Sequence, residues 1–127
     1  MGHIGLLPQT SINYKVKGRN VAQEEKILND ANAISKSGAF AIVIECVVES
    51  LAKKITKNVT VPTIGIGASK YCDGQVIVSD DMLGLSDFSP KFVKQYSNLK
   101  KIIEKSIKKY SKDVKLRRFP SNKNVYK

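Results

Sequence analysis

Hydrophobic positions along the chain fall into short unbroken runs and longer stretches with a helical period. The run at residues 40–48 is almost wholly apolar and rich in β-branched side chains, which is typical of a strand buried on both faces of a parallel sheet. Residues 61–68 and 75–78 are further strand candidates, with Pro62 acceptable only at the start of its strand. Residues 2–8 resemble the tail of a strand that leads into a loop.

Helical spacing is found between these runs. Residues 23–37 carry apolar side chains at helical intervals with Gly38 as a C-terminal stop signal, and residues 49–56 predict a shorter helix. A polar stretch at residues 8–20 is interpreted as a long loop. Strands therefore alternate with helices, and this order favours parallel strands joined by right-handed crossovers.

The clearest periodicity lies near the C-terminus. Ser89 and Pro90 suit an N-cap and the first position of a helix. Apolar residues then recur every three or four positions, with lysines opposite them, and predict a long amphipathic helix. The apolar positions are Phe92, Tyr96, Leu99, Ile103, Ile107, Tyr110 and Val114.

The number of elements suggests an incomplete barrel. An open sheet of so few strands leaves unpaired edges and a poorly covered core. A complete TIM (β/α)₈ barrel needs about 250 residues, and this chain has 127. We therefore expect an α/β fold in which residues 1–127 form a single partial domain, the C-terminal half of a (β/α)₈ barrel.

The net charge of +11 is concentrated at one end of the chain. Residues 90–127 hold 13 of the 22 Lys and Arg but only 2 of the 11 Asp and Glu, so residues 1–89 are balanced. This segment could bind acidic proteins, nucleic acid or an anionic substrate, and a solvated lysine face would look the same. Its polar face is nearly all lysine, whereas RNA-binding surfaces usually add aromatic or arginine groups.

Composition also indicates a location. No apolar run is long enough to cross a bilayer, and we see no signal peptide at the N-terminus. Cys46 and Cys72 are far apart and match no metal-binding spacing, so we interpret them as reduced thiols in a cytoplasmic protein.

One charged residue interrupts the apolar run at residues 40–48. Glu45 lies near the C-terminal end of that strand, the end at which α/β proteins place their chemistry. Its apolar neighbours in sequence would disfavour the charged carboxylate by desolvation, as suits a general base. A structural glutamate paired with a buried lysine or arginine is an equal alternative from the residues alone. Cys46 follows it and is expected on the opposite face, in the core.

Several motifs, taken together and in order, resemble the ketopantoate hydroxymethyltransferase family over essentially all 127 residues. The resemblance implies strands 5–8 of a TIM barrel. It also implies transfer of a hydroxymethyl group from 5,10-methylenetetrahydrofolate to 3-methyl-2-oxobutanoate, which gives 2-dehydropantoate in pantothenate biosynthesis. The motifs are GHIGL with PQ at 2–9, YKVKGR at 14–19, IECV at 44–47, LAKKIT at 51–56, IGIGA at 64–68, CDGQ at 72–75 and PKFV at 90–93.

The same resemblance implies roles for two residues. Glu45 matches the family's catalytic base, and His3 matches a histidine that could hydrogen-bond the bound keto acid or Glu45. The family's Mg²⁺ ligands lie on early strands, so no metal ligand is assigned in this chain. Asp80 and Asp81 are expected to be loop or capping residues.

The resemblance further implies a missing N-terminal half and a homo-oligomer, commonly a decamer, with no nucleic-acid or membrane partner. Without that half, we expect the chain alone to be inactive. Two other interpretations stay open: a small basic nucleic-acid-binding protein and a non-catalytic oligomerisation fragment.

Overall fold

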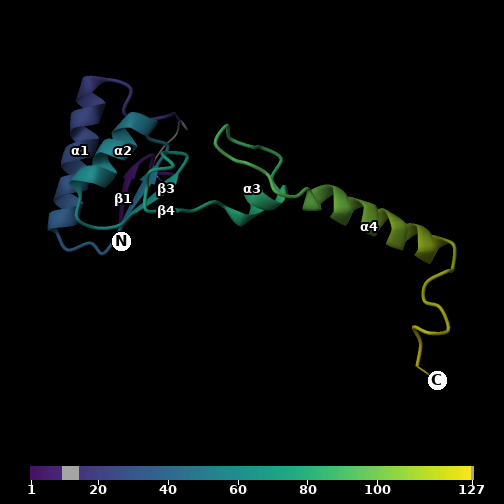
Figure 1. Ribbon diagram of the computed structural model, residues 1–127. Helices are drawn as coiled ribbons and strands as arrows, with labels where there is room; N and C mark the ends of the chain where they lie inside the picture. Colours follow the sequence, from purple (N-terminus) through teal and green to yellow (C-terminus); the bar gives the residue numbers. More distant parts are fainter. Residues whose placement is uncertain (10–14, 127) are drawn as a thin grey trace. The chain divides into compact units, whose positions relative to one another are not determined.

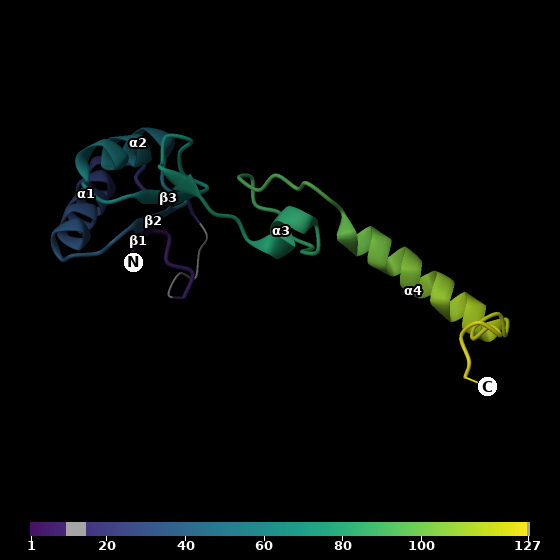
Figure 2. The same cartoon turned by 60° about the horizontal axis from the view of Figure 1, so that its bottom comes forward.

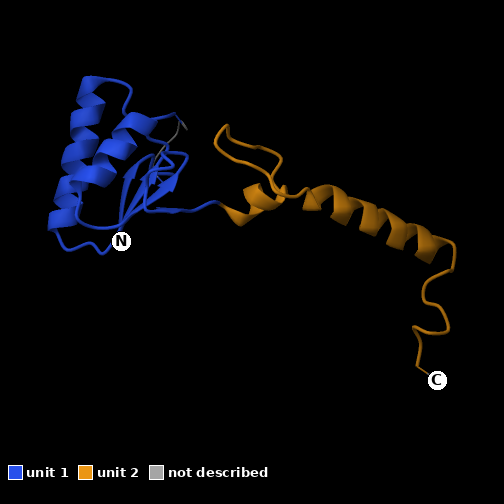
Figure 3. Cartoon of the chain, viewed as in Figure 1, with its two compact units in different colours: residues 1–77 blue, residues 78–127 orange. Residues whose placement is uncertain are grey.

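The computed structural model describes residues 1–9 and 15–126, so residues 10–14 of the expected loop lie outside it. The chain divides into two compact units, residues 1–77 and 78–127, which Figure 3 distinguishes by colour. Each unit is described here by itself. The expectation that residues 1–127 form one partial domain stays a prediction.

Unit 1 contains a parallel four-stranded sheet in the order β1-β2-β3-β4 (Figure 1). Its strands are β1 (Gly2–Gly5), β2 (Ile42–Glu45), β3 (Thr63–Ile66) and β4 (Gly74–Gln75). The predicted alternation of parallel strands and helices is confirmed. β2 and β3 are shorter than their apolar runs, and the strand expected at 75–78 is wrong beyond Gln75 because β4 ends there. β2, for example, ends at Glu45 because Cys46 takes a positive φ of 50°, which extended backbone does not allow.

Two helices cover one face of this sheet, α1 (Val21–Lys36) and α2 (Glu49–Asn58) (Figures 1 and 2). The Asn20 side chain caps α1 by accepting the Gln23 N–H. The helices lie on the same face because their buried residues form one cluster with alternate strand residues that point the same way. That cluster contains Ile4, Ile42 and Ile44 from the strands, Ile27 and Ala31 from α1, and Leu51, Ala52 and Ile55 from α2.

A polar network fixes the start of β3. The Asp73 carboxylate accepts the Thr63 backbone N–H at 2.8 Å and the Thr63 hydroxyl at 2.9 Å. Thr63 is completely buried, and its hydroxyl also lies 2.9 Å from that of Thr56 on α2. The backbone hydrogen bond from Thr63, followed by its hydroxyl, holds the pKa of Asp73 below its ordinary value. The network therefore joins β3, α2 and the loop before β4.

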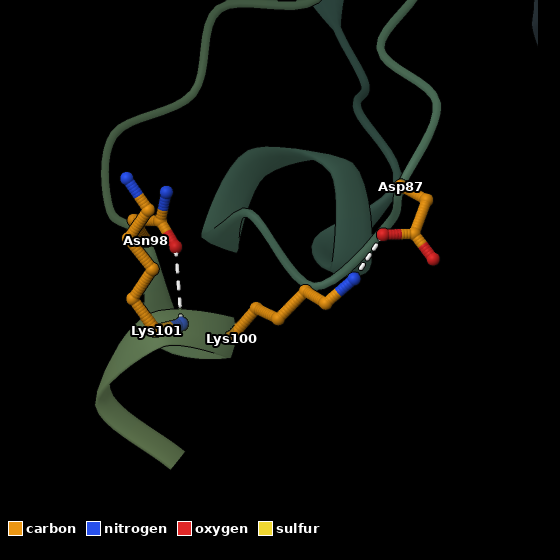
Figure 4. Close-up of polar contacts among 4 residues, drawn as sticks. All are labelled: Asp87, Asn98, Lys100 and Lys101. Atoms are coloured by element: carbon orange, nitrogen blue, oxygen red, sulfur yellow. Dashed lines mark hydrogen bonds and ion pairs between the residues drawn. The ribbon is translucent and has the colours of Figure 1, made fainter. Parts of the chain in front are cut away.

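Unit 2 contains α3 (Ser79–Leu83) and α4 (Leu99–Lys115). An amphipathic C-terminal helix is present, but the expected start at Pro90 is wrong. The Tyr96 N–H donates to the Met82 carbonyl at 2.8 Å, so the backbone before α4 bonds to α3 instead of continuing a helix. The Asn98 side chain then caps α4 by accepting the Lys101 N–H (Figure 4).

An ion pair also fastens the first turn of α4. The Lys100 ammonium donates to the Asp87 carboxylate in the loop after α3, as Figure 4 shows.

In the described part of the chain, no helix has the length and apolar character that a membrane span requires.

Candidate functional site

The candidate site lies at the carboxyl end of β2, on the sheet face opposite the two helices. Ile42 and Ile44 point toward the helices and are fully buried, so alternation turns Val43 and Glu45 to the other face. The Glu45 side chain keeps 14% of its surface exposed. The strand thus presents one carboxylate on the face without helices.

His3 on β1 reaches this carboxylate from the neighbouring strand. It pairs in register with Val43, which lies two residues before Glu45 and on the same face of the sheet. Its Nε2 lies 3.2 Å from Glu45 Oε2. That nitrogen is buried, yet it has no aligned hydrogen-bond partner among the described residues. The two atoms are therefore in close polar contact, but their orientation is not that of a hydrogen bond.

Two of the apolar neighbours of Glu45 in sequence face away from its carboxylate. Ile42 and Ile44 belong to the core beneath the helices and do not surround the carboxylate, because a strand sends alternate side chains to opposite faces. Among the described residues, the ionisable side chain within 4 Å of the Glu45 carboxylate is His3, and no lysine or arginine forms a salt bridge with it.

The backbone around Glu45 is held by three segments. The Glu45 carbonyl accepts the Leu6 N–H at 2.8 Å, and the Cys46 N–H donates to the Ile66 carbonyl at 2.9 Å. The Lys17 N–H donates to the Cys46 carbonyl at 2.8 Å, which brings the loop after β1 alongside β2. Backbone hydrogen bonds therefore connect the end of β2 to the residue after β1, to β3 and to this loop.

Cys46 is buried beside the site, in agreement with its expected place in the core. Burial, and then the negative charge of Glu45, raise the pKa of the Cys46 thiol. A thiol whose thiolate is disfavoured is a poor nucleophile and a poor metal ligand. Cys46 is thus a packing residue next to the carboxylate.

A cavity of about 490 Å³ adjoins His3 at the outer edge of β1. Its walls are the β1 edge and the flank of α1, and Lys17 lies at the same cavity. β1 is the end strand of the sheet, and no strand among the described residues of unit 1 pairs with that edge. The cavity is lined by His3, Ile4, Gly5, Leu7, Lys17, Gln23, Lys26, Ile27, Asp30, Ala33 and Ile34.

Two other carboxylates considered in the sequence belong to unit 2. Asp80 and Asp81 were expected in a loop or at a cap, but they lie within the first turn of α3, whose N-cap is Val78 and has no side-chain capping hydrogen bond. No group of three or more His, Cys, Asp or Glu residues suited to a metal ion occurs in residues 1–9 and 15–126. The sequence named Asp73 only within the CDGQ motif, and no local pattern signals its contact with Thr63 ten residues earlier.

Comparison with known proteins gives one consistent result. A family model described as ketopantoate hydroxymethyltransferase matches residues 1–122. Three curated relatives carry the name 3-methyl-2-oxobutanoate hydroxymethyltransferase. The protein from Pelagibacter ubique is 52% identical over 126 residues, which cover 99% of this chain and 49% of the relative. The protein from Caulobacter vibrioides is 51% identical over 129 residues, which cover 99% of this chain and 47% of the relative. The protein from Bartonella henselae is 51% identical over 131 residues, which cover 100% of this chain and 47% of the relative. The chain spans about half the length of these relatives.

Proposed function

The chain belongs to the ketopantoate hydroxymethyltransferase family, and we propose that it supplies the base-bearing half of such an enzyme. The reaction moves a hydroxymethyl group from 5,10-methylenetetrahydrofolate to 3-methyl-2-oxobutanoate and yields 2-dehydropantoate for pantothenate synthesis. The observation that carries the proposal is the Glu45 carboxylate at the end of a parallel strand, 3.2 Å from His3 Nε2. Carboxylates near the carboxyl ends of such strands are well placed for chemistry.

Glu45 is the general base of this proposal. The reaction must remove a proton from C3 of the keto acid, next to the carbonyl carbon. The C3–H bond breaks, the proton moves to a Glu45 carboxylate oxygen, and the electron pair forms an enolate. C3 of the enolate then bonds to the methylene carbon of the folate, both carbon–nitrogen bonds of that methylene break, water supplies the hydroxyl group, and tetrahydrofolate leaves. His3 orients the carboxylate or donates a hydrogen bond to the bound keto acid, and its buried Nε2 is available for either contact.

The family resemblance also brings Mg²⁺ into the proposal. The described residues do not fit that ion, because they bring together no group of three or more metal-ligating side chains. We therefore assign no step of the reaction to a metal ion bound by this chain. Its ligands are proposed to belong to the other half of the protein.

We further propose that the chain is strands 5–8 of a (β/α)₈ barrel, with residues 1–127 as one partial domain and α4 as its long C-terminal helix. Sequential parallel strands with both helices of unit 1 on one face support this, because a barrel winds in one direction only. The unpaired β1 edge and the cavity beside it would receive the neighbouring strand and helix. On family grounds we propose a cytoplasmic homo-oligomer.

The experiment mixes the purified chain with the half of the Pelagibacter ubique relative that this chain does not match. Hydroxymethyl transfer is then assayed with Mg²⁺, 5,10-methylenetetrahydrofolate and 3-methyl-2-oxobutanoate. We expect an active pair, inactive separate parts, and loss of activity in Glu45→Gln. Glu49→Gln, at an exposed carboxylate that begins α2, is the matched control and should keep activity. An inactive pair alongside an active fused chain would refute the split enzyme, and an inactive fused chain would refute the function.

A further inference from the structure

Gly5 is the residue of β1 that stands directly beside Glu45 in the sheet. The two are partners in the parallel register, and Gly5 takes a φ of +91°. This left-handed conformation, which glycine adopts without steric cost, ends β1 and turns the chain. The following Leu6 N–H then reaches the Glu45 carbonyl at 2.8 Å, while Leu6 itself is almost fully buried.

No side chain fits at Gly5. A Cβ atom there would lie 2.2 Å from the Glu45 carbonyl oxygen and 2.6 Å from Val47 Cγ2. Non-bonded atoms approach favourably only at about 3.5–4.0 Å, so β1 and the end of β2 would have to separate by more than about 1 Å. The nearest of these atoms, the Glu45 carbonyl oxygen, belongs to the backbone and cannot move aside as the end of a flexible side chain could.

We infer that Gly5 is a positioning residue for Glu45. Its missing side chain lets β1 close onto the Glu45 carbonyl, and this closure sets the distance between the Glu45 carboxylate and His3. The inference rests on the proposed role of Glu45 for its meaning in catalysis. The positional claim concerns only contacts within unit 1, so it can be tested without any enzyme activity.

The first test compares Gly5→Ala with Gly38→Ala in the full chain. Gly38 has a similar φ of +83° but open space around its Cβ position, so its variant carries the backbone strain without the collision. His3 is the one histidine in the chain, and its ring signals can therefore be read without ambiguity in a proton NMR spectrum at fixed pH. We expect Gly5→Ala to shift these signals and Gly38→Ala to leave them in place; unshifted signals in a folded Gly5→Ala chain would overturn the inference.

Two further measurements test the inference even if the Gly5→Ala chain does not fold. In the wild-type chain, the Leu6 amide should exchange slowly with solvent because it donates to Glu45, and exchange at the rate of an open loop would overturn the inference. Adding Val47→Ala to Gly5→Ala removes the contact at 2.6 Å but leaves the closer one with the carbonyl. Full recovery of the wild-type His3 signals would point to simple overpacking instead of displacement of Glu45.

The second test uses the complex with the other half of the Pelagibacter ubique relative. Exchange of the C3 proton of 3-methyl-2-oxobutanoate with deuterium should fall about 100-fold in Gly5→Ala, since a misplacement of about 1 Å can cost that much. KM should change little, and Gly38→Ala should stay within about twofold of wild type. Equal rates for both variants would overturn the catalytic part. Absence of exchange in the wild-type complex would count against the proposed function, whereas the NMR comparison would still decide the position of Glu45.

Discussion

Replacement of Asp73 by alanine should destabilise unit 1 through the buried Thr63. The Asp73 carboxylate accepts both the backbone N–H and the hydroxyl of Thr63, at 2.8 and 2.9 Å. Thr63 has no exposed surface, so in the folded wild-type chain its donors depend on protein acceptors. The hydroxyl can still bond Thr56, but the backbone N–H at the start of β3 loses its acceptor.

The size of the effect follows from these two donors. A hydrogen bond to a charged group contributes about 1.5–3 kcal/mol, and a buried donor left unpaired costs about 1–3 kcal/mol. Asp73 itself is exposed, and solvent screening lowers the first figure. We therefore expect a loss of about 2 kcal/mol in the free energy of unfolding of unit 1.

Urea denaturation followed by circular dichroism measures this loss. Asp30→Ala is the matched control, because Asp30 forms an exposed pair with Lys26 and should cost less than about 0.5 kcal/mol. The pKa of Asp73 is lowered in the folded chain, so its stabilisation is present above the unfolded pKa and is lost as pH falls through the folded pKa. The difference between wild type and Asp73→Ala should thus shrink in acid. A cost equal to that of Asp30→Ala, or a difference independent of pH, would refute the reasoning.

Two further predictions concern the core and the thiol beside the site. Leu51→Ala removes a core side chain that is 2% exposed and should lower the free energy of unfolding by about 2–5 kcal/mol, measured by the same denaturation; a loss below 1 kcal/mol would mean that α2 does not pack as described. Cys46, whose thiol pKa is raised by burial and by Glu45, should react with iodoacetamide much more slowly in the folded chain than in urea, and peptide mass spectrometry showing equal rates would contradict its place in the core.

Periodic patterns predicted the elements of unit 1 well and their ends less well. The helix at residues 23–37 and the helix at residues 49–56 correspond to α1 and α2, because apolar spacing reports which face must be buried. The apolar run at 40–48 overstated β2, since the positive φ of Cys46 has no signal in hydrophobicity. α4 begins nine residues after Pro90, at Leu99, because a hydrogen bond from Tyr96 to Met82 outweighs a local capping pattern.

The residues of the candidate site were also only partly predictable from the sequence. Glu45 was identifiable because a carboxylate in an apolar run is unusual. The expectation that Cys46 lies on the opposite face assumed strand alternation, but Cys46 lies just beyond β2 and has a positive φ. The approach of His3 depends on strand register, which pairs residues about forty positions apart and cannot be derived from local spacing. The collision that any side chain at Gly5 would cause depends on the same pairing.

The most direct test of the account is proton exchange at C3 of 3-methyl-2-oxobutanoate. It is measured in deuterated buffer with the chain joined by the other half of the Pelagibacter ubique relative. We expect rapid exchange with wild type and Glu49→Gln, and exchange close to the uncatalysed rate with a folded Glu45→Gln chain. Exchange that survives in Glu45→Gln would contradict the central claim that Glu45 takes the proton.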